Sequence, residues 1–181
     1  HVQLVHSAFF GGFFLALAAS PTFFNGLLNS RPFPGRCSMT SIPLSAISAW
    51  HPQAPLQRLH FDWLAGVELA VLRLDLIDPL ISGNKWFKLA PHLRLAAEQG
   101  ADGIISLGGA HSNHLHALAA AGQRFSFATV GLLRGHPHDT PTVQDLKRFG
   151  MQLNWLGYGG YRERHRPEFW ASWQARYPGF M

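Results

Sequence analysis

Short apolar runs alternate along the chain with longer segments in which apolar residues recur at every third or fourth position. The short runs are rich in aliphatic and β-branched residues, which is typical of buried strands. They predict strands at residues 67–74, 103–107, 127–133 and 151–156. The longer segments predict helices at residues 85–99, 112–121, 141–149 and 168–176.

The regular alternation of these segments predicts the fold class. Strands separated by helices of about ten residues form βαβ units, which build a parallel sheet covered by helices. We therefore expect an α/β fold with three αβα layers. In such folds ligands bind beside the carboxyl ends of the strands. Three loops follow predicted strand ends and are candidates for a site: residues 82–85, 108–114 and 133–136.

The predicted helix at residues 85–99 is bounded by recognisable signals. Asn84 is expected to cap its start, and Gly100 is expected to end it. Pro91 lies inside the pattern and predicts a kink or a division of the helix. The spacing predicts a buried face made of Trp86, Leu89, Leu93 and Ala96. A second face gathers Lys85, Lys88 and His92.

The first 38 residues differ from the rest of the chain. Residues 9–19 form an apolar run followed by small residues, as in a secretory signal peptide. No Lys or Arg precedes this run, and it is too short to span a membrane. Because Met39 is the first methionine, we expect residues 1–38 to be an upstream or signal-like extension with little structure; a true export signal is the alternative. Residues 39–66 contain several prolines and predict loops.

Composition narrows the possible classes of protein. Of the 181 residues, 47% are hydrophobic and 14% are charged, which indicates a packed globular chain and not a disordered one. The net charge of +5 could attract an anion, but the basic residues are scattered and no nucleic-acid motif accompanies them. We expect no nucleic-acid partner and no membrane association. Cys37 is the single cysteine, which excludes an internal disulfide and fits a reducing compartment such as the cytoplasm.

Lys85 follows the small-residue turn Ser82-Gly83 at the start of a predicted helix. The positive end of the helix dipole disfavours an ammonium group there and favours the neutral amine, which is the nucleophilic form. Such an amine can form a Schiff base with a carbonyl compound. Taken alone, however, Lys85 is more simply interpreted as a solvated surface lysine.

The loop at residues 108–114 strengthens the case for a site. Gly108-Gly109 allows a ligand to approach the backbone closely. Ser112 and Asn113, at a predicted helix start, offer a hydroxyl, an amide and free backbone N–H groups, which suit an anion such as a carboxylate. A simple helix cap is the alternative interpretation of these two residues.

Several histidines lie in or near these loops and raise the question of a metal site. His111 and His114 share a helix face, but His116 does not, and no carboxylate or cysteine lies near them in the sequence. We therefore expect no metal. Residues 136–139 predict a flexible loop.

Four sequence elements in order resemble one known family. They are Arg73-Leu74-Asp75, the G-N-K-x-x-K-L element in residues 82–89, the G-G-x-x-S-N element in residues 108–114, and Gly131-Leu132-Leu133-Arg134-Gly135. Together they resemble the 1-aminocyclopropane-1-carboxylate deaminase / D-cysteine desulfhydrase family. These are pyridoxal-phosphate enzymes of the tryptophan synthase β-like fold, or fold type II. The second and third elements are specific as a pair, and the resemblance covers about residues 55–180.

The resemblance implies roles at the matching positions. Lys85 would hold pyridoxal 5'-phosphate through a Schiff base and move protons at the substrate carbon. Asn113 would hydrogen-bond the cofactor's ring oxygen, and Ser112 would bind the substrate carboxylate or assist proton transfer. Lys88 would support position or charge. The expected reaction is deamination of a small amino acid of the D-cysteine or 1-aminocyclopropane-1-carboxylate type, in a parent enzyme that is a homodimer.

The same resemblance places a phosphate-binding loop rich in Gly, Ser and Thr in the second half of such enzymes, and none follows Gly109 here. We therefore expect residues 39–181 to be the N-terminal α/β part of such an enzyme, truncated before the phosphate-binding half and inactive by itself. One alternative is another fold type II enzyme that performs β-elimination or β-replacement. A second is a non-catalytic α/β domain that binds an anion or a partner through an open sheet edge.

Overall fold

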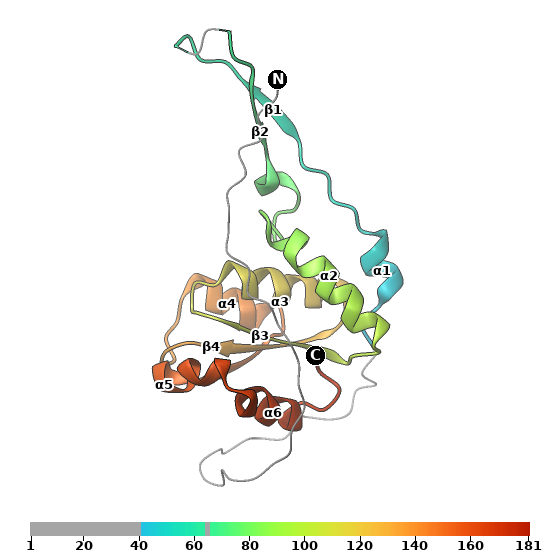
Figure 1. Cartoon of the computed structure of the whole chain (residues 1–181), viewed down its shortest axis with the longest axis vertical. Helices are drawn as coiled ribbons and strands as arrows, with labels where there is room; N and C mark the ends of the chain where they lie inside the picture. Colours follow the sequence, from blue (N-terminus) through green and yellow to red (C-terminus); the bar gives the residue numbers. More distant parts are fainter. Residues whose placement is uncertain (1–40, 64–65) are drawn as a thin grey trace.

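The structure is a computed structural model that describes residues 41–63 and 66–181 (Figure 1). The predictions for residues 1–38 lie outside the described residues. None of the described helices is long and apolar enough to cross a membrane.

A parallel sheet of three strands lies at the centre of the fold. The strands β3 (Gly103–Gly108), β4 (Ala128–Leu133) and β5 (Gln152–Trp155) are hydrogen-bonded in this order. In their register Gly108 pairs with Leu133, and Leu133 pairs with Trp155. The carboxyl ends of the strands therefore meet along one edge of the sheet.

Helices cover both faces of this sheet (Figure 1). On one face lie α2 (Lys85–Glu98), α3 (Asn113–Phe125) and α4 (Pro141–Arg148). On the other face lie α5 (Gly157–Arg162) and α6 (Pro167–Arg176), joined by the 3₁₀ segment η2 (Glu163–His165). The three-layer α/β fold predicted from the alternation of strands and helices is confirmed.

The two sides of the sheet have separate apolar cores, because successive side chains of a strand point to opposite faces. On β3, Ile104 belongs to the core shared with α2, α3 and α4, whereas Ile105 belongs to the core beneath α6. On β4, Leu133 belongs to the core shared with α2, α3 and α4, and Leu132 belongs to the core beneath α6. Both faces are therefore buried, as expected for a parallel sheet.

The last two residues extend the sheet beyond β3. Phe180 forms a parallel bridge with Gly103, and the backbone N–H of Met181 donates to the Gly103 carbonyl at 3.0 Å. A Cβ atom at position 103 would lie 2.4 Å from the Phe180 ring and 2.5 Å from the Ala128 carbonyl oxygen. Only glycine fits this crowded strand start.

The strand predicted at residues 67–74 exists, but the prediction that it belongs to the parallel sheet was wrong. The strand β2 (Leu69–Leu72) lies inside the predicted segment, but it pairs antiparallel with β1 (Leu56–Leu59) in a separate two-stranded sheet. Leu56 faces Leu72 and Leu59 faces Leu69 in this hairpin. Figure 1 shows the hairpin projecting away from the parallel sheet. The reason is proximity, because a strand close in sequence can pair without a crossover helix.

Residues 39–66 were also predicted as loops, and this was wrong for two segments. They contain β1 and the short helix α1 (Leu44–Ala49), which buries Ile47. Prolines around both segments gave the impression of a continuous loop. In the same way, the glycine-rich segment that forms α5 carried no helical pattern.

The predicted boundaries of α2 are confirmed, but its division at Pro91 is not. The helix is continuous, and Pro91 lies on its exposed side. The Phe87 carbonyl, which loses its intrahelical partner because proline has no N–H, belongs to a half-exposed residue. At the other end Gly100 has a φ of 68°, and its N–H donates to the Ala97 carbonyl at 3.1 Å.

Candidate functional site

The first turn of α3 is built on a tight junction with β3. Ser112 is the N-cap, and its Oγ accepts a hydrogen bond from the Leu115 N–H at 3.1 Å. A Cβ at position 108 would lie 2.6 Å from this Oγ and 2.7 Å from the Leu115 side chain. At Gly109, in contrast, a Cβ would meet nothing within 4 Å. Gly108 therefore allows the helix to pack, and Gly109 borders open space.

The loop before α2, which carries Lys85, was predicted to follow a strand of the parallel sheet, and this was wrong. The loop follows β2 of the separate hairpin, and the 3₁₀ segment η1 (Leu74–Leu76) lies between β2 and this loop. Gly83 has a φ of 70°, and its N–H donates to the Leu74 carbonyl at 2.8 Å. Lys85 reaches the site because α2 packs beside α3.

Asn84 occupies the predicted cap position, but its side chain does not cap the helix. Its Oδ1 accepts instead a hydrogen bond from Lys85 Nζ at 2.9 Å. No carboxylate forms an ion pair with Lys85 within residues 41–63 and 66–181. The amine is therefore held by a neutral amide oxygen and not by an opposite charge.

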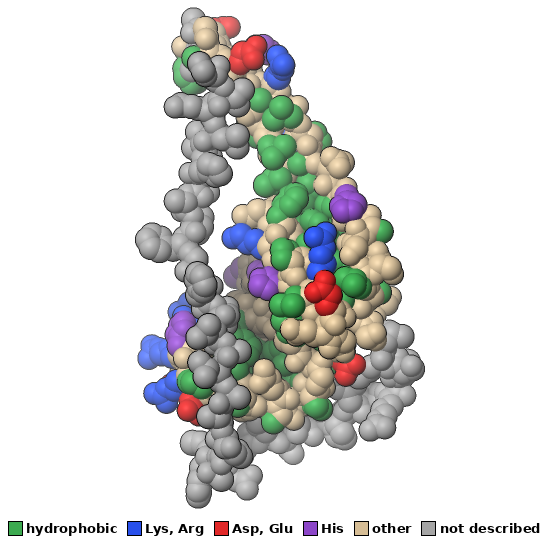
Figure 2. Space-filling view, turned by 45° about the vertical axis from the view of Figure 1, so that its right-hand side comes forward, with side chains coloured by type: hydrophobic (Ala, Val, Ile, Leu, Met, Phe, Trp, Pro, Cys, Tyr) green, Lys and Arg blue, Asp and Glu red, His purple; other side chains and the backbone are tan. Residues whose placement is uncertain are grey.

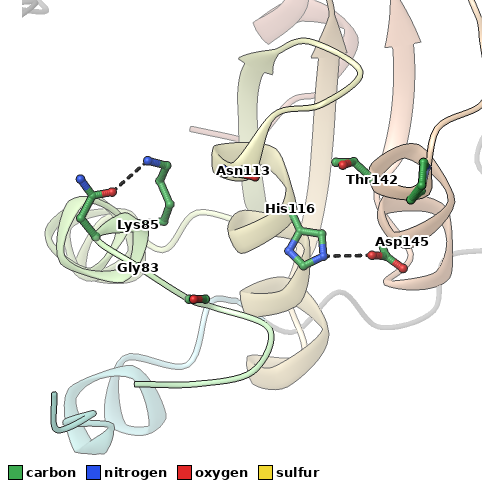
Figure 3. Close-up of a pocket in the computed structure, with 9 residues that line it drawn as sticks. Gly83, Lys85, Asn113, His116, Thr142 and Asp145 are labelled. Carbon is green, nitrogen blue, oxygen red and sulfur yellow. Dashed lines mark hydrogen bonds and ion pairs between the residues drawn. The ribbon is translucent and has the colours of Figure 1, made fainter. Parts of the chain in front are cut away.

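A cavity of about 460 Å³ brings residues of both motifs together (Figure 3). Lys85 reaches it from the start of α2, and Asn113 from the start of α3. Residues 133–136 do not line it, so the third predicted loop is not part of this cavity. Its full lining is Ser82, Gly83, Asn84, Lys85, Asn113, His116, Pro141, Thr142 and Asp145.

His116 and Asp145 form a pair on the cavity wall that sequence reasoning missed. His116 Nε2 lies 3.2 Å from Asp145 Oδ2 (Figure 3), and the other carboxylate oxygen forms an ion pair with Arg148 at 2.7 Å. The His116 ring also meets the Phe149 ring edge-on at 5.3 Å. One available signal was that His116 follows Asn113 by three residues and so shares its helix face.

His114 lies on the side of α3 that faces α2. Its Nε2 is 2.9 Å from Ser106 Oγ on β3. Burial lowers the pKa of His114, and the nearby charges of Lys85, His92 and Lys88 lower it further. His114 is therefore neutral at pH 7, and it does not add to the positive charge of this interface.

The three histidines near the start of α3 have separate surroundings. His111 lies 6.4 Å from the ring of His138, His114 contacts Ser106, and His116 contacts Asp145. Within the described part of the chain, no three His, Cys, Asp or Glu side chains lie close enough together to hold a metal ion.

The fold and the cavity define an α/β protein with a lysine and an asparagine from neighbouring helix starts on one ligand-sized cavity. No family model matches the chain. A Pyrococcus abyssi protein named "Putative 1-aminocyclopropane-1-carboxylate deaminase" is 34% identical over 98 residues, which are 54% of this chain and 29% of that protein. An Arabidopsis thaliana protein, the mitochondrial bifunctional D-cysteine desulfhydrase/1-aminocyclopropane-1-carboxylate deaminase, is 34% identical over 94 residues, which are 51% of this chain and 23% of that protein.

A solved structure described as an ACC deaminase homologue has the same fold. Its TM-score is 0.56 at 25% identity, and the match covers 76% of this chain and 46% of that one. The predicted resemblance to the 1-aminocyclopropane-1-carboxylate deaminase / D-cysteine desulfhydrase family is therefore confirmed. The matched segments span less than a third of these curated relatives and less than half of the solved structure.

Proposed function

We propose that the cavity attaches pyridoxal 5'-phosphate through Lys85 and serves the deamination of a small amino acid. The substrate class is that of the relatives' names, a D-cysteine or 1-aminocyclopropane-1-carboxylate type of amino acid. The observation that carries the proposal is the meeting of Lys85 and Asn113, from two separate motifs, on one cavity.

The residues on the cavity fit the aldehyde end of this cofactor. A volume of about 460 Å³ lies within the usual range for small-molecule sites, roughly 300–1,000 Å³. Among the described residues, Lys85 Nζ would exchange a hydrogen bond to the Asn84 amide and would break no ion pair. When bound, pyridoxal phosphate supplies an electron sink for the bond-breaking chemistry of amino acids.

Each neighbouring side chain has a defined task in this proposal. Lys85 would hold the cofactor and move a proton at the substrate carbon. Asn113 would donate a hydrogen bond from its side-chain amide to the cofactor. Ser112 does not line the cavity but directly precedes Asn113, and its oxygen accepts from the Leu115 N–H, which leaves its hydroxyl hydrogen for a substrate carboxylate.

The proposal includes weak binding and little turnover by this chain alone. No loop rich in Gly, Ser and Thr follows Gly109 in the sequence to hold the phosphate group. Much of the affinity for a phosphorylated cofactor comes from such a loop, because its backbone N–H groups surround the anion. Lys85 would then attach the cofactor without the contacts that such a loop makes to the phosphate group.

Absorbance spectroscopy on the 181-residue chain tests the attachment. Mixing with pyridoxal phosphate should produce the absorbance band of the amine-bound cofactor, and Lys85→Ala should remove at least about nine-tenths of it, because Lys85 is the only lysine among the described residues that lines the cavity. Lys147→Ala, a lysine on α4 that does not line the cavity, is the matched control and should keep the band.

Borohydride reduction followed by peptide mass spectrometry locates the attachment. The chain has three lysines, at positions 85, 88 and 147, so the assignment is unambiguous. Equal modification of all three would contradict a site at Lys85. Rapid turnover of D-cysteine by the chain alone would contradict the weak-activity part of the proposal.

A further inference from the structure

Asp78 ties the loop before α2 to the far end of α3. Its carboxylate is buried, and Oδ1 accepts hydrogen bonds from the backbone N–H groups of Leu80 at 2.9 Å and Ile81 at 2.8 Å. Oδ2 accepts from Nη2 of Arg124, in the last turn of α3, at 2.5 Å. One carboxylate therefore both shapes the loop that leads to Lys85 and fastens it to α3.

A second anchor holds the residue that directly follows the candidate lysine. The ring of Trp86 is buried and meets the Trp50 ring edge-on at a centroid distance of 4.2 Å. It also lies 5.9 Å from the ring of Phe125, at the end of α3. The Arg124 guanidinium lies 4.5 Å above the Trp50 ring, so the arginine that pairs with Asp78 also covers this aromatic cluster.

The two anchors enclose a short segment with Lys85 in it, and both rest on the last turn of α3. The first turn of the same helix carries Asn113. Because an α-helix is a rigid rod over this length, fastening the segment to one end of α3 sets its position relative to the other end. Further support comes from Ser82 Oγ, which donates to the Asp75 carbonyl at 3.1 Å.

We propose that Asp78 and Arg124 are positioning residues, here called the α3 clamp, that hold Lys85 in register with Asn113 on the cavity. The inference rests on the proposed function of Lys85. Asp78 is the only acidic residue that is buried within residues 41–63 and 66–181. Only the carboxylate of this pair is buried, and the cost of desolvating it offsets much of its attraction to the partly exposed Arg124, so we assign the pair a role in fixing geometry.

Competitive labelling of the three lysines measures the position of Lys85 directly. The full chain is exposed to limiting pyridoxal phosphate, reduced with borohydride, and the labelling ratio of Lys85 to Lys147 is determined by mass spectrometry. Asp78→Asn keeps an oxygen for the two backbone N–H groups but removes the charge that pairs with Arg124. Because small misplacements of a reacting group cost large factors in rate, the ratio should fall about tenfold.

Further variants separate positioning from stability. Arg124→Gln should also lower the ratio about tenfold, and Arg124→Lys should restore part of it because a cation is kept. Glu163→Gln breaks a surface ion pair with Arg166 on the opposite face of the sheet and should leave the ratio unchanged. An unchanged ratio in folded Asp78→Asn and Arg124→Gln, as judged by circular dichroism, would overturn the clamp.

Two outcomes need a second readout. If Asp78→Asn does not fold, the Arg124→Gln variant provides the test, because the Arg124 side chain is 34% exposed and tolerates truncation better.

If wild-type Lys85 is labelled no faster than Lys147, the proposed function fails. The α3 clamp is then tested by the hydrogen-exchange rate of the Gly83 amide. That amide, bonded to the Leu74 carbonyl, should exchange about tenfold faster in the clamp variants, and unchanged exchange would refute the clamp independently.

Discussion

The strands β2 and β4 have similar side chains and opposite environments. β2 reads Leu-Ala-Val-Leu and is exposed at every position, whereas β4 reads Ala-Thr-Val-Gly-Leu-Leu and is buried at five of its six positions. β2 pairs with β1 alone, while β4 lies between two strands with helices on both faces. Aliphatic composition is thus enough to predict a strand, but the neighbours decide whether it is part of a core.

The hairpin also presents an apolar surface that the parallel sheet does not. Figure 2 shows hydrophobic side chains gathered along its length. The larger of these exposed side chains are Leu56, Phe61, Trp63, Val67, Leu69, Val71 and Leu72. A two-stranded sheet without a covering layer is only marginally stable in water, so the hairpin should be the least stable part of the described structure.

The largest expected difference between the two strands is in the cost of losing a leucine. Leu132 on β4 is fully buried, and Leu132→Ala should lower the free energy of unfolding by about 2–5 kcal/mol because it leaves a cavity. Leu72 on β2 is 55% exposed, and Leu72→Ala should change the free energy of unfolding by no more than about 0.5 kcal/mol. Urea unfolding of both variants makes the measurement. Similar losses at the two positions would show that the hairpin is packed in solution.

A smaller effect is expected at the junction between β3 and α3. Gly108→Ala should destabilise the chain by about 1–3 kcal/mol, because the new methyl group would overlap the cap Ser112 and the side chain of Leu115. The neighbouring Gly109→Ala is a matched control that meets no atom within 4 Å and should have little effect. Thermal unfolding of the pair tests the tight packing at this site. Equal melting temperatures would contradict it.

The smallest effect concerns the pH dependence of the loop that carries Lys85. Burial alone would raise the pKa of Asp78, but hydrogen bonds from the N–H groups of Ile81 and Leu80 and from Arg124 hold it below its usual value of 3.8. A depressed folded-state pKa stabilises the fold above the unfolded value, and this contribution is lost as pH falls through the folded value.

Unfolding titrations from pH 6 to pH 2 therefore sharpen the comparison. The stability difference between the wild type and Asp78→Asn should be constant above about pH 5 and shrink below about pH 4. Asp139→Asn is a surface control. The Asp139 pKa is also lowered, mainly by a hydrogen bond from Gln144, but this side chain is 58% exposed and its effect is screened. A difference that stays constant down to pH 2 would contradict a depressed pKa at Asp78.

Much of the parallel-sheet unit could be predicted from the sequence because its signals are local. Pro141 begins α4 as expected, and the preceding Thr140 caps the helix, with its Oγ accepting from the Val143 N–H at 3.0 Å. Gly100 ends α2 through a left-handed backbone that glycine adopts without strain. Caps, glycines and apolar periodicity each act within a few residues, so they can be read before the fold is known.

The candidate site was predictable only in part. Lys85 and Asn113 belong to local motifs, and their shared cavity followed from the resemblance. The His116–Asp145 pair joins residues 29 positions apart, and the Asp78–Arg124 pair joins residues 46 apart. Neither pair has a local pattern, because each depends on how two elements pack side by side.

The sequence by itself determined the α/β alternation, the start and end of the main helices, and the two motifs that carry Lys85 and Asn113. The tertiary structure decided that β2 leaves the parallel sheet, that α2 brings Lys85 to the start of α3, and that a buried carboxylate fastens its loop. The physical reason is the range of the forces involved. Dihedral preferences and caps act over a few residues, whereas strand pairing, burial and ion pairing are settled only when distant segments pack together.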